Sequence, residues 1–170
     1  VKYLPTYIFP MEQMVILSYV KGVITGIHHI AISVPDLEIA SKFYHEVLGF
    51  EKVFDNRWDG DRPIADQVIG LEKTQAKVQM LKAGNAYLEI WEYGFPIPET
   101  QDFNYSAANH GLAHFALQVT DITSEYERLS DNGMTFHSPP VDLGGSFAIY
   151  GRDPFGNILE LYEVSEERSI

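Results

Sequence analysis

The chain has 170 residues, of which 12 are Lys or Arg and 24 are Asp or Glu, so its formal net charge at pH 7 is −12. This excess of negative charge argues against nucleic acids and anionic membranes as partners. The absence of cysteine excludes disulfides, thiolate metal sites and cysteine nucleophiles. The hydrophobic fraction of 45% is enough for a compact core.

The first segment, residues 1–23, differs in pattern from the rest of the chain. It is apolar but interrupted by Pro5, Pro10 and Glu12, and no run in it reaches the length of a membrane span. We expect an N-terminal extension or a remnant of expression here. We further expect a soluble, cytoplasmic protein without nucleic acid or membrane partners.

Two stretches of the chain, 26–34 and 111–119, are copies of one another. "GIHHIAISV" and "GLAHFALQV" align His29 with His114, and two positions after each stretch Asp36 aligns with Asp121. Each aspartate precedes a helical pattern, at 37–48 and at 122–132, where an N-cap residue belongs. The beginnings of two related modules are therefore indicated.

The ends of the modules repeat as well. "GNAYLEIWE" (84–92) resembles "GNILELYE" (156–163), which aligns Glu89 with Glu160. Each module has room for two further strands before this closing strand, so the pattern predicts an α+β fold of two tandem βαβββ modules. The expected boundaries are 24–95 for the first module, 96–110 for a linker, 111–164 for the second module and 165–170 for a C-terminal tail.

Strand periodicity separates the polar residues into two faces, because successive side chains point to opposite sides of a sheet. His29 shares a roomy face with Ala31 and Ser33, whereas His28 shares an apolar face that should pack beneath the helix. By the same rule Glu89 and Glu160 point to one side. Their neighbours Glu92 and Glu163 point to the other side and are expected to be solvated.

His29, Glu89, His114 and Glu160 therefore form a symmetric set of two imidazoles and two carboxylates. A single histidine in a strand is more often a structural residue than a ligand. Four such residues related by an internal repeat instead indicate a nitrogen–oxygen metal site. One divalent ion per site is expected, and Ni, Zn, Co, Mn and Fe remain open.

The sequence at this point resembles the vicinal oxygen chelate superfamily, which includes glyoxalase I, methylmalonyl-CoA epimerase, extradiol dioxygenases and the bleomycin- and fosfomycin-resistance proteins. The motifs that carry the resemblance are "HHIAISVPDLEIASKFYHEVLGFE", "GNAYLEIWE", "HFALQVTD" and "DPFGNILELYE". The resemblance implies a cleft of curved mixed β-sheet with helices outside, and a homodimer. It also implies that His29, Glu89, His114 and Glu160 are the metal ligands on the cleft floor.

The same resemblance implies metal-dependent lyase or isomerase chemistry on a small oxygenated substrate. The metal would stabilise an enediolate-type oxyanion, and Glu160 or Glu89 would be the catalytic group that moves a proton. Ser33 and Tyr93 replace the arginine and asparagine with which glyoxalase I binds glutathione, which argues against glutathione adducts. A non-haem Fe(II) extradiol-type dioxygenase and a non-catalytic, antibiotic-binding protein remain alternatives.

Candidate substrate contacts come from the expected cleft and from a long segment between strands. The segment 55–75 is read as a loop that covers the site or is simply solvated. The cleft is expected to be polar, with Lys77 and Gln79 sharing a strand face, and to contain aromatic side chains. The candidates for substrate binding are Trp91, Tyr150, Gln118, Arg57 and Trp58.

Overall fold

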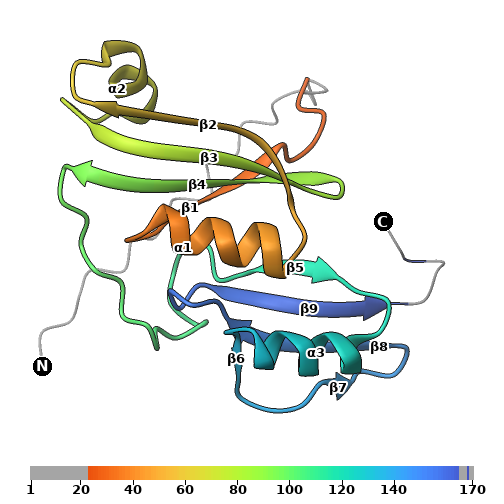
Figure 1. Cartoon of the computed structure of the whole chain (residues 1–170). Helices are drawn as coiled ribbons and strands as arrows, with labels where there is room; N and C mark the ends of the chain where they lie inside the picture. The colour runs from red at the N-terminus through yellow and green to blue at the C-terminus, as the bar shows by residue number, and fades with distance from the viewer. Residues whose placement is uncertain (1–22, 165–167, 169–170) are drawn as a thin grey trace, which may run out of the picture.

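The computed structural model describes residues 23–164 and residue 168 (Figure 1). The expected N-terminal extension, apart from Val23, and the expected C-terminal tail, apart from Arg168, lie outside the described residues. Within the described part, no helix is both long and apolar enough to cross a membrane.

The first module forms a four-stranded sheet with the order β1-β4-β3-β2, in which β1 is parallel to β4 and the other neighbours are antiparallel. Its helix begins as α1 and continues in π-helical form as η2. The elements are β1 (His29–Ser33), α1 (Leu37–Ser41), η2 (Lys42–Val47), β2 (Glu51–Asp59), α2 (Pro63–Ile69), β3 (Gln75–Ala83) and β4 (Ala86–Phe95).

The second module repeats this plan with the order β5-β9-β8-β6, and a short strand, β7, also pairs with β8. The opening strand β5 is again parallel to the closing strand β9. The elements are β5 (Phe115–Gln118), α3 (Ile122–Asp131), β6 (Thr135–Phe136), β7 (Val141–Asp142), β8 (Ser146–Arg152) and β9 (Ile158–Val164). The prediction of an α+β fold is confirmed.

Both helices begin where the sequence predicts. The Asp36 carboxylate accepts hydrogen bonds from the backbone N–H groups of Glu38 and Ile39, and Asp121 accepts one from Ser124. These bonds satisfy backbone donors that the first turn of a helix leaves without a partner.

The last glutamates of the two closing strands, Glu92 and Glu163, were expected to be solvated. In the structure each accepts a hydrogen bond from a backbone N–H group. Glu92 Oε2 accepts a 2.8 Å hydrogen bond from the backbone N–H of Leu37, and Glu163 Oε2 accepts one of 2.9 Å from Ile122. Each carboxylate thus lies at the positive end of its module's helix, where a negative charge is stabilised. The second glutamate of each closing strand therefore ties that strand to the helix.

The helical sides of the two modules share one hydrophobic core (Figure 1). Leu88 and Ile90 from β4 belong to the same buried cluster as Leu159 and Leu161 from β9. A hydrogen bond of 2.6 Å from Tyr44 on η2 to Asp153, in the turn before β9, joins the modules within this core. Because the helical sides face inward, the opposite faces of both sheets remain open.

The segment 55–75 is not the long loop that was expected. β2 continues to Asp59, and α2 occupies residues 63–69 with Pro63 in its first turn. None of the residues of α2 is buried, and the helix was missed although Pro63 at its start and Gly70 at its end are helix boundary signals. Asp66 attaches α2 to the segment before β3, because its carboxylate accepts hydrogen bonds from the backbone N–H groups of Lys73 and Thr74 and from the Thr74 hydroxyl.

This attachment of α2 is expected to be lost at low pH. The hydrogen bond from the Thr74 hydroxyl, followed by those from the backbone, lowers the pKa of Asp66 below its ordinary value. A carboxyl group with a lowered pKa favours the attached state above its ordinary pKa, and this contribution disappears as pH falls through the lowered value. The indole N–H of Trp58 donates to Thr74 Oγ1 over 2.9 Å, so tryptophan emission should report the release.

Acidification from pH 7 to about 2 should therefore change the emission of the wild type, and the change should lie below the ordinary carboxyl pKa of about 3.9, because the pKa of Asp66 is lowered in the attached state. Asp66→Asn should show the altered emission already at pH 7. An acid transition of unchanged size in Asp66→Asn would contradict the assignment to this carboxyl.

Candidate functional site

The first pair of candidate ligands lies on the open face of the first sheet. β1 and β4 are parallel neighbours, and their register places Ala31 opposite Glu89. His29 Nε2 lies 3.9 Å from Glu89 Oε2. The same carboxylate oxygen accepts a 2.7 Å hydrogen bond from the indole N–H of Trp91. The indole thus fixes the orientation of Glu89 beside the imidazole.

His28 belongs to this site, although the sequence analysis assigned it to the core. It is exposed, its ring stacks on Tyr87 at a centroid distance of 4.8 Å, and its Nδ1 lies 3.0 Å from Nδ1 of His29. His28 precedes β1, so the alternation of strand faces does not apply to it. A group that holds one ring nitrogen of a histidine orients the other, which here is the Nε2 that faces Glu89.

The second pair lies on the open face of the second sheet. His114 Nε2 lies 3.0 Å from Glu160 Oε2, and the Tyr150 hydroxyl lies 3.4 Å from the same ring nitrogen. β8 and β9 pair Tyr150 directly with Glu160, which explains why all three side chains meet. His114 Nδ1 is buried and has no hydrogen-bond partner among the described residues.

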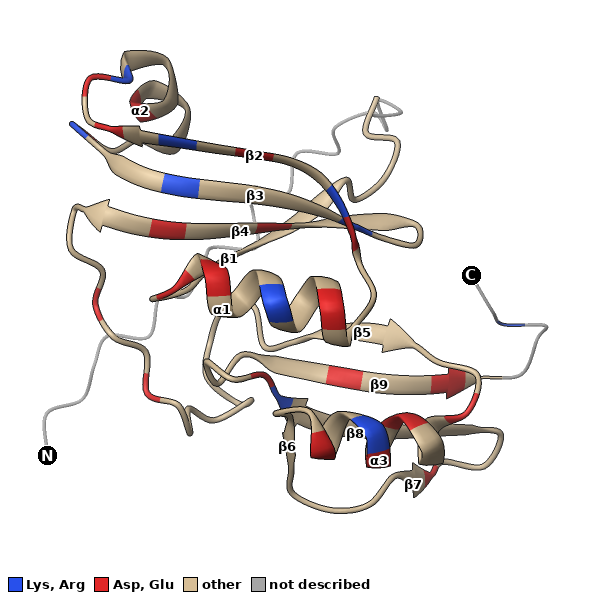
Figure 2. Cartoon of the chain, viewed as in Figure 1, with Lys and Arg blue, Asp and Glu red and all other residues tan. Residues whose placement is uncertain are grey.

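Each module thus forms a pair of the same kind, and Figure 2 shows the two acidic bands on β4 and the two on β9 that result from the repeat. Among residues 23–164 and 168, no group of three or more His, Asp or Glu side chains is close enough to hold a metal ion. The cleft that His29 lines contains residues of the first module only. The four candidate ligands are therefore present as two half-sites rather than as one cluster within the chain.

The donors of each pair fit a divalent ion. Two atoms bound to one ion at about 2.1 Å lie about 3 to 4 Å apart, depending on the angle between the bonds. The separations of 3.0 Å in the second pair and 3.9 Å in the first are in this range. Imidazole nitrogen and carboxylate oxygen suit Zn, Ni, Co, Mn and Fe(II) alike.

A cleft of about 930 Å³ extends from the first pair towards α2. Trp58 and Trp91, both predicted substrate contacts, line it, and their rings meet edge to face at 5.8 Å. Its sheet-side floor includes Val78, whereas Lys77 and Gln79 lie on the other side of β3 and line a separate groove beside α1. The cleft is therefore apolar, in contrast to the polar lining that was expected.

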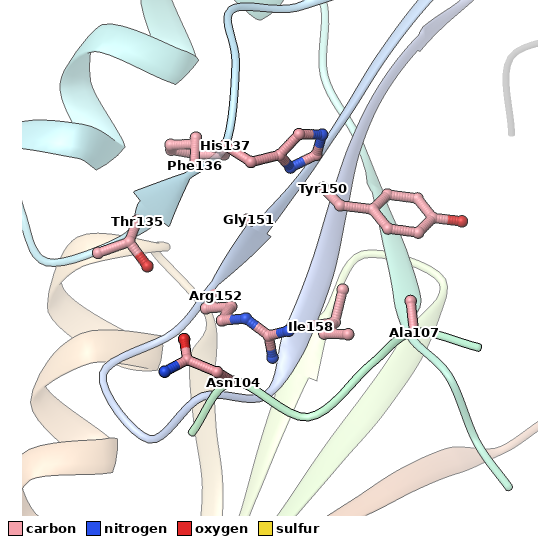
Figure 3. A pocket seen from close by; sticks show the side chains of 9 residues that line it. All are labelled: Asn104, Ala107, Thr135, Phe136, His137, Tyr150, Gly151, Arg152 and Ile158. Carbon is pink, nitrogen blue, oxygen red and sulfur yellow. The ribbon is translucent and has the colours of Figure 1, made fainter. Parts of the chain in front are cut away.

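A smaller pocket, of about 380 Å³, adjoins the second pair through Tyr150 (Figure 3). Thr135, His137 and Arg152 contribute polar groups to it. The Arg152 guanidinium donates to the backbone carbonyls of Gly156 and Tyr105, at 2.8 and 2.5 Å, and lies 5.0 Å from the Tyr105 ring centre. The second half-site is consequently the more polar of the two.

Of the other two predicted substrate contacts, Arg57 lies away from both pairs, and Gln118 lies on the same face of the second sheet as Glu160. Arg57 lines the groove beside α1, on the opposite face of the first sheet from His29. Gln118 is half-buried at the end of β5, in register with Tyr162 of β9. The structure thus places Trp58 and Trp91 beside the first pair, Tyr150 beside the second pair, and Arg57 away from both.

Two tyrosines beside the half-sites have shifted acidities. Burial, and then the nearby carboxylate of Glu89, raise the pKa of Tyr93. Burial, and then Glu160, raise the pKa of Tyr150. Both phenols therefore keep their proton at neutral pH and can donate a hydrogen bond at the open face.

Comparison with known proteins adds four findings. Residues 26–161 match the model of the Glyoxalase/Bleomycin resistance protein/Dioxygenase superfamily. A 2-epi-5-epi-valiolone epimerase from Actinomyces sp. is 29% identical over 152 residues, which cover 82% of this chain and 79% of that relative.

Among solved structures, a glyoxalase family protein from Bacillus cereus superposes with a TM-score of 0.76 at 20% identity, covering 85% of this chain and 97% of that one. The fosfomycin resistance protein FosX from Listeria monocytogenes, in complex with Mn(II) and sulfate, superposes with a TM-score of 0.56 at 18% identity, covering 85% and 96%.

Proposed function

Because the chain belongs to the Glyoxalase/Bleomycin resistance protein/Dioxygenase superfamily, we propose that it is a metal-dependent isomerase or epimerase of a small oxygenated substrate. The observation that carries the proposal is the imidazole–carboxylate pair on the open face of each module. The similarity to an epimerase supports the proposed reaction type, and the similarity to a protein solved with Mn(II) supports the proposed metal dependence.

The active site would be completed by a second copy of the chain. Each chain offers two half-sites on separate open faces, and neither half-site alone supplies the three or four protein ligands typical of a catalytic metal. In a dimer with two-fold symmetry, the first pair of one chain can meet the second pair of the other, and the symmetry then produces two equal sites. This supports the expected homodimer.

A divalent ion held by His29, Glu89, His114 and Glu160 would supply Lewis-acid stabilisation of an oxyanion on the substrate. The protein groups then have separate tasks. The indole of Trp91 holds Glu89 Oε2, so that Glu89 Oε1 is the atom placed to accept a proton from carbon beside a carbonyl. The Tyr150 hydroxyl, next to His114, can donate a hydrogen bond to a substrate oxygen.

Metal analysis and proton exchange test this proposal. Wild-type protein purified without a metal column should contain about one divalent ion per chain, and His29→Ala and Glu160→Ala should contain almost none, because removing a ligand weakens binding at least about 100-fold. Metal-loaded wild type should exchange the C2 proton of 2-hydroxycyclohexanone for deuterium in D₂O, as followed by proton NMR.

Other outcomes would identify the alternatives. Consumption of oxygen with a catechol, together with bound iron, would indicate a dioxygenase. No metal uptake from any of the five candidate ions would indicate a binding protein without metal chemistry. Glu38→Ala, which removes an exposed carboxylate at the start of α1, is the matched control and should retain metal and exchange.

A further inference from the structure

The cleft beside His29 and Glu89 indicates which substrates the site accepts. We infer that the substrate carries an apolar group of at least the size of a six-membered ring, and that this group lies between β2–β3 and α2. The inference rests on the proposed function only in taking the His29–Glu89 pair as the reacting end of the cleft.

The aromatic residues of the cleft form an apolar surface of fixed shape. The rings of Trp91 and Tyr93 are stacked at 5.3 Å with an interplanar angle of 8°, and Trp58 meets Trp91 edge to face. Val78, which is 4% exposed, lies on the strand between them. Such a surface gains free energy by covering an apolar ring, and its ring faces offer no partner to a hydroxyl group.

The wall opposite this surface is α2, whose apolar residues have no partner within the described chain. Ile64 is 81% exposed and Val68 is 83% exposed, yet both line the cleft. They are one helical turn apart and so lie on one side of α2. Apolar side chains turned towards a cleft but left uncovered are typical of a binding surface for an apolar ligand.

The indole N–H groups of the aromatic surface are already occupied. The Trp58 indole donates to Thr74, and the Trp91 indole donates to Glu89. The Arg62 guanidinium lies 5.8 Å from the Trp58 ring centre, at the edge of the cleft where α2 begins. Ring hydroxyl groups that face the tryptophan rings or Ile64 and Val68 of α2 would therefore be buried without partners, which is unfavourable.

Two probes that differ only in hydroxyl groups test this inference. Cyclohexanecarboxylate and quinate share a six-membered ring and a carboxylate, but quinate carries four hydroxyl groups on its ring. Both tryptophans of the chain line the cleft, so intrinsic emission reports binding without a label. The titrations are made with the full chain in EDTA and again after loading with Mn(II).

Cyclohexanecarboxylate should bind at least about tenfold more tightly than quinate, with or without metal, because its apolar ring is removed from water. The double variant Ile64→Ser/Val68→Ser should reduce this preference to less than about threefold. The matched control, Ile97→Ser/Leu143→Ser, changes two exposed apolar residues outside the cleft and should keep the full preference.

The possible failures are distinguishable. Three results would overturn the inference. Quinate could bind as tightly as cyclohexanecarboxylate or more tightly, or cyclohexanecarboxylate could fail to bind. The third result is a preference for cyclohexanecarboxylate that survives the α2 substitutions. A selective cleft in a protein that takes up no metal would overturn the proposed function and leave the inference intact. Metal uptake by a protein that shows no preference between the two probes would overturn the inference and leave the proposed function intact.

Discussion

Coexpressed His29→Ala and His114→Ala chains are expected to regain about one quarter of the wild-type metal content, although each variant alone binds almost none. The reason is the separation of the two half-sites within one chain. When two kinds of chain assort at random into symmetric dimers, about half of the dimers are mixed, and each mixed dimer has one intact site of two. Elemental analysis of the whole coexpressed population measures this quarter, and in the mixed dimer isolated through two affinity tags the expected content is about one half of the wild-type value.

The matched control is coexpression of wild type with the double variant His29→Ala/His114→Ala. For the whole population, shared sites predict about one quarter of the wild-type metal here too: every site of a mixed dimer contains one altered half, and only the wild-type homodimers keep their sites. Sites built within one chain predict about one half in this control and no recovery in the first experiment. In the isolated mixed dimer, shared sites predict one half of the wild-type metal in the first experiment and none in the control, whereas sites within one chain predict the reverse, whatever the extent of assortment.

Asp153→Ala is expected to lower the free energy of unfolding by about 3–5 kcal/mol, the largest effect on stability that we predict. Asp153 is completely buried and accepts hydrogen bonds from the Tyr44 hydroxyl, from the backbone of Phe155 and Asn157, and from the Asn157 side chain. Without the carboxylate, these donors lose their common acceptor inside the shared core. Urea unfolding followed by circular dichroism measures the loss.

Tyr44→Phe removes only one of these donors and should cost about 1–3 kcal/mol. Burial, followed by the charge of Asp153, raises the pKa of Tyr44 well above its ordinary value, so the phenol donates its proton at any pH at which the fold is studied. Asp131→Ala, at an exposed position, should change stability by less than about 0.5 kcal/mol. A loss of similar size for Asp131 and Asp153 would contradict the role given to the buried carboxylate.

Internal repetition is what made much of this fold predictable. The alignment of His29 with His114 and of Glu89 with Glu160 correctly predicted where the opening strands, the helix starts and the two closing strands lie in the sequence. Alternation along β4 also placed Glu89 and Trp91 on the same open face. These features depend on residues close in sequence, and a two-residue period is sufficient to derive them.

The features that were missed depend on contacts between distant segments or on irregular backbone. His28 lies just before β1, so strand alternation gave it the wrong surroundings. The solvation expected for Glu92 ignored the helix start that its carboxylate reaches. The helix 63–69 was overlooked although Pro63 marks its start and Gly70 its end. The meeting of the two helical sides is a property of the whole chain.

The spacing of the two glutamates in each closing strand has a consequence for how such a protein can change. Glu92 follows Glu89 by three positions, and Glu163 follows Glu160 by three, which places one carboxylate on the open face and the other at a helix start. Insertion of a single residue between them would bring both to one face. The closing strands are thus intolerant of length changes, whereas the connection between β2 and β3 has accommodated a whole helix. New substrate preferences can therefore arise by lengthening that connection, while the residues proposed for the chemistry are inherited unaltered.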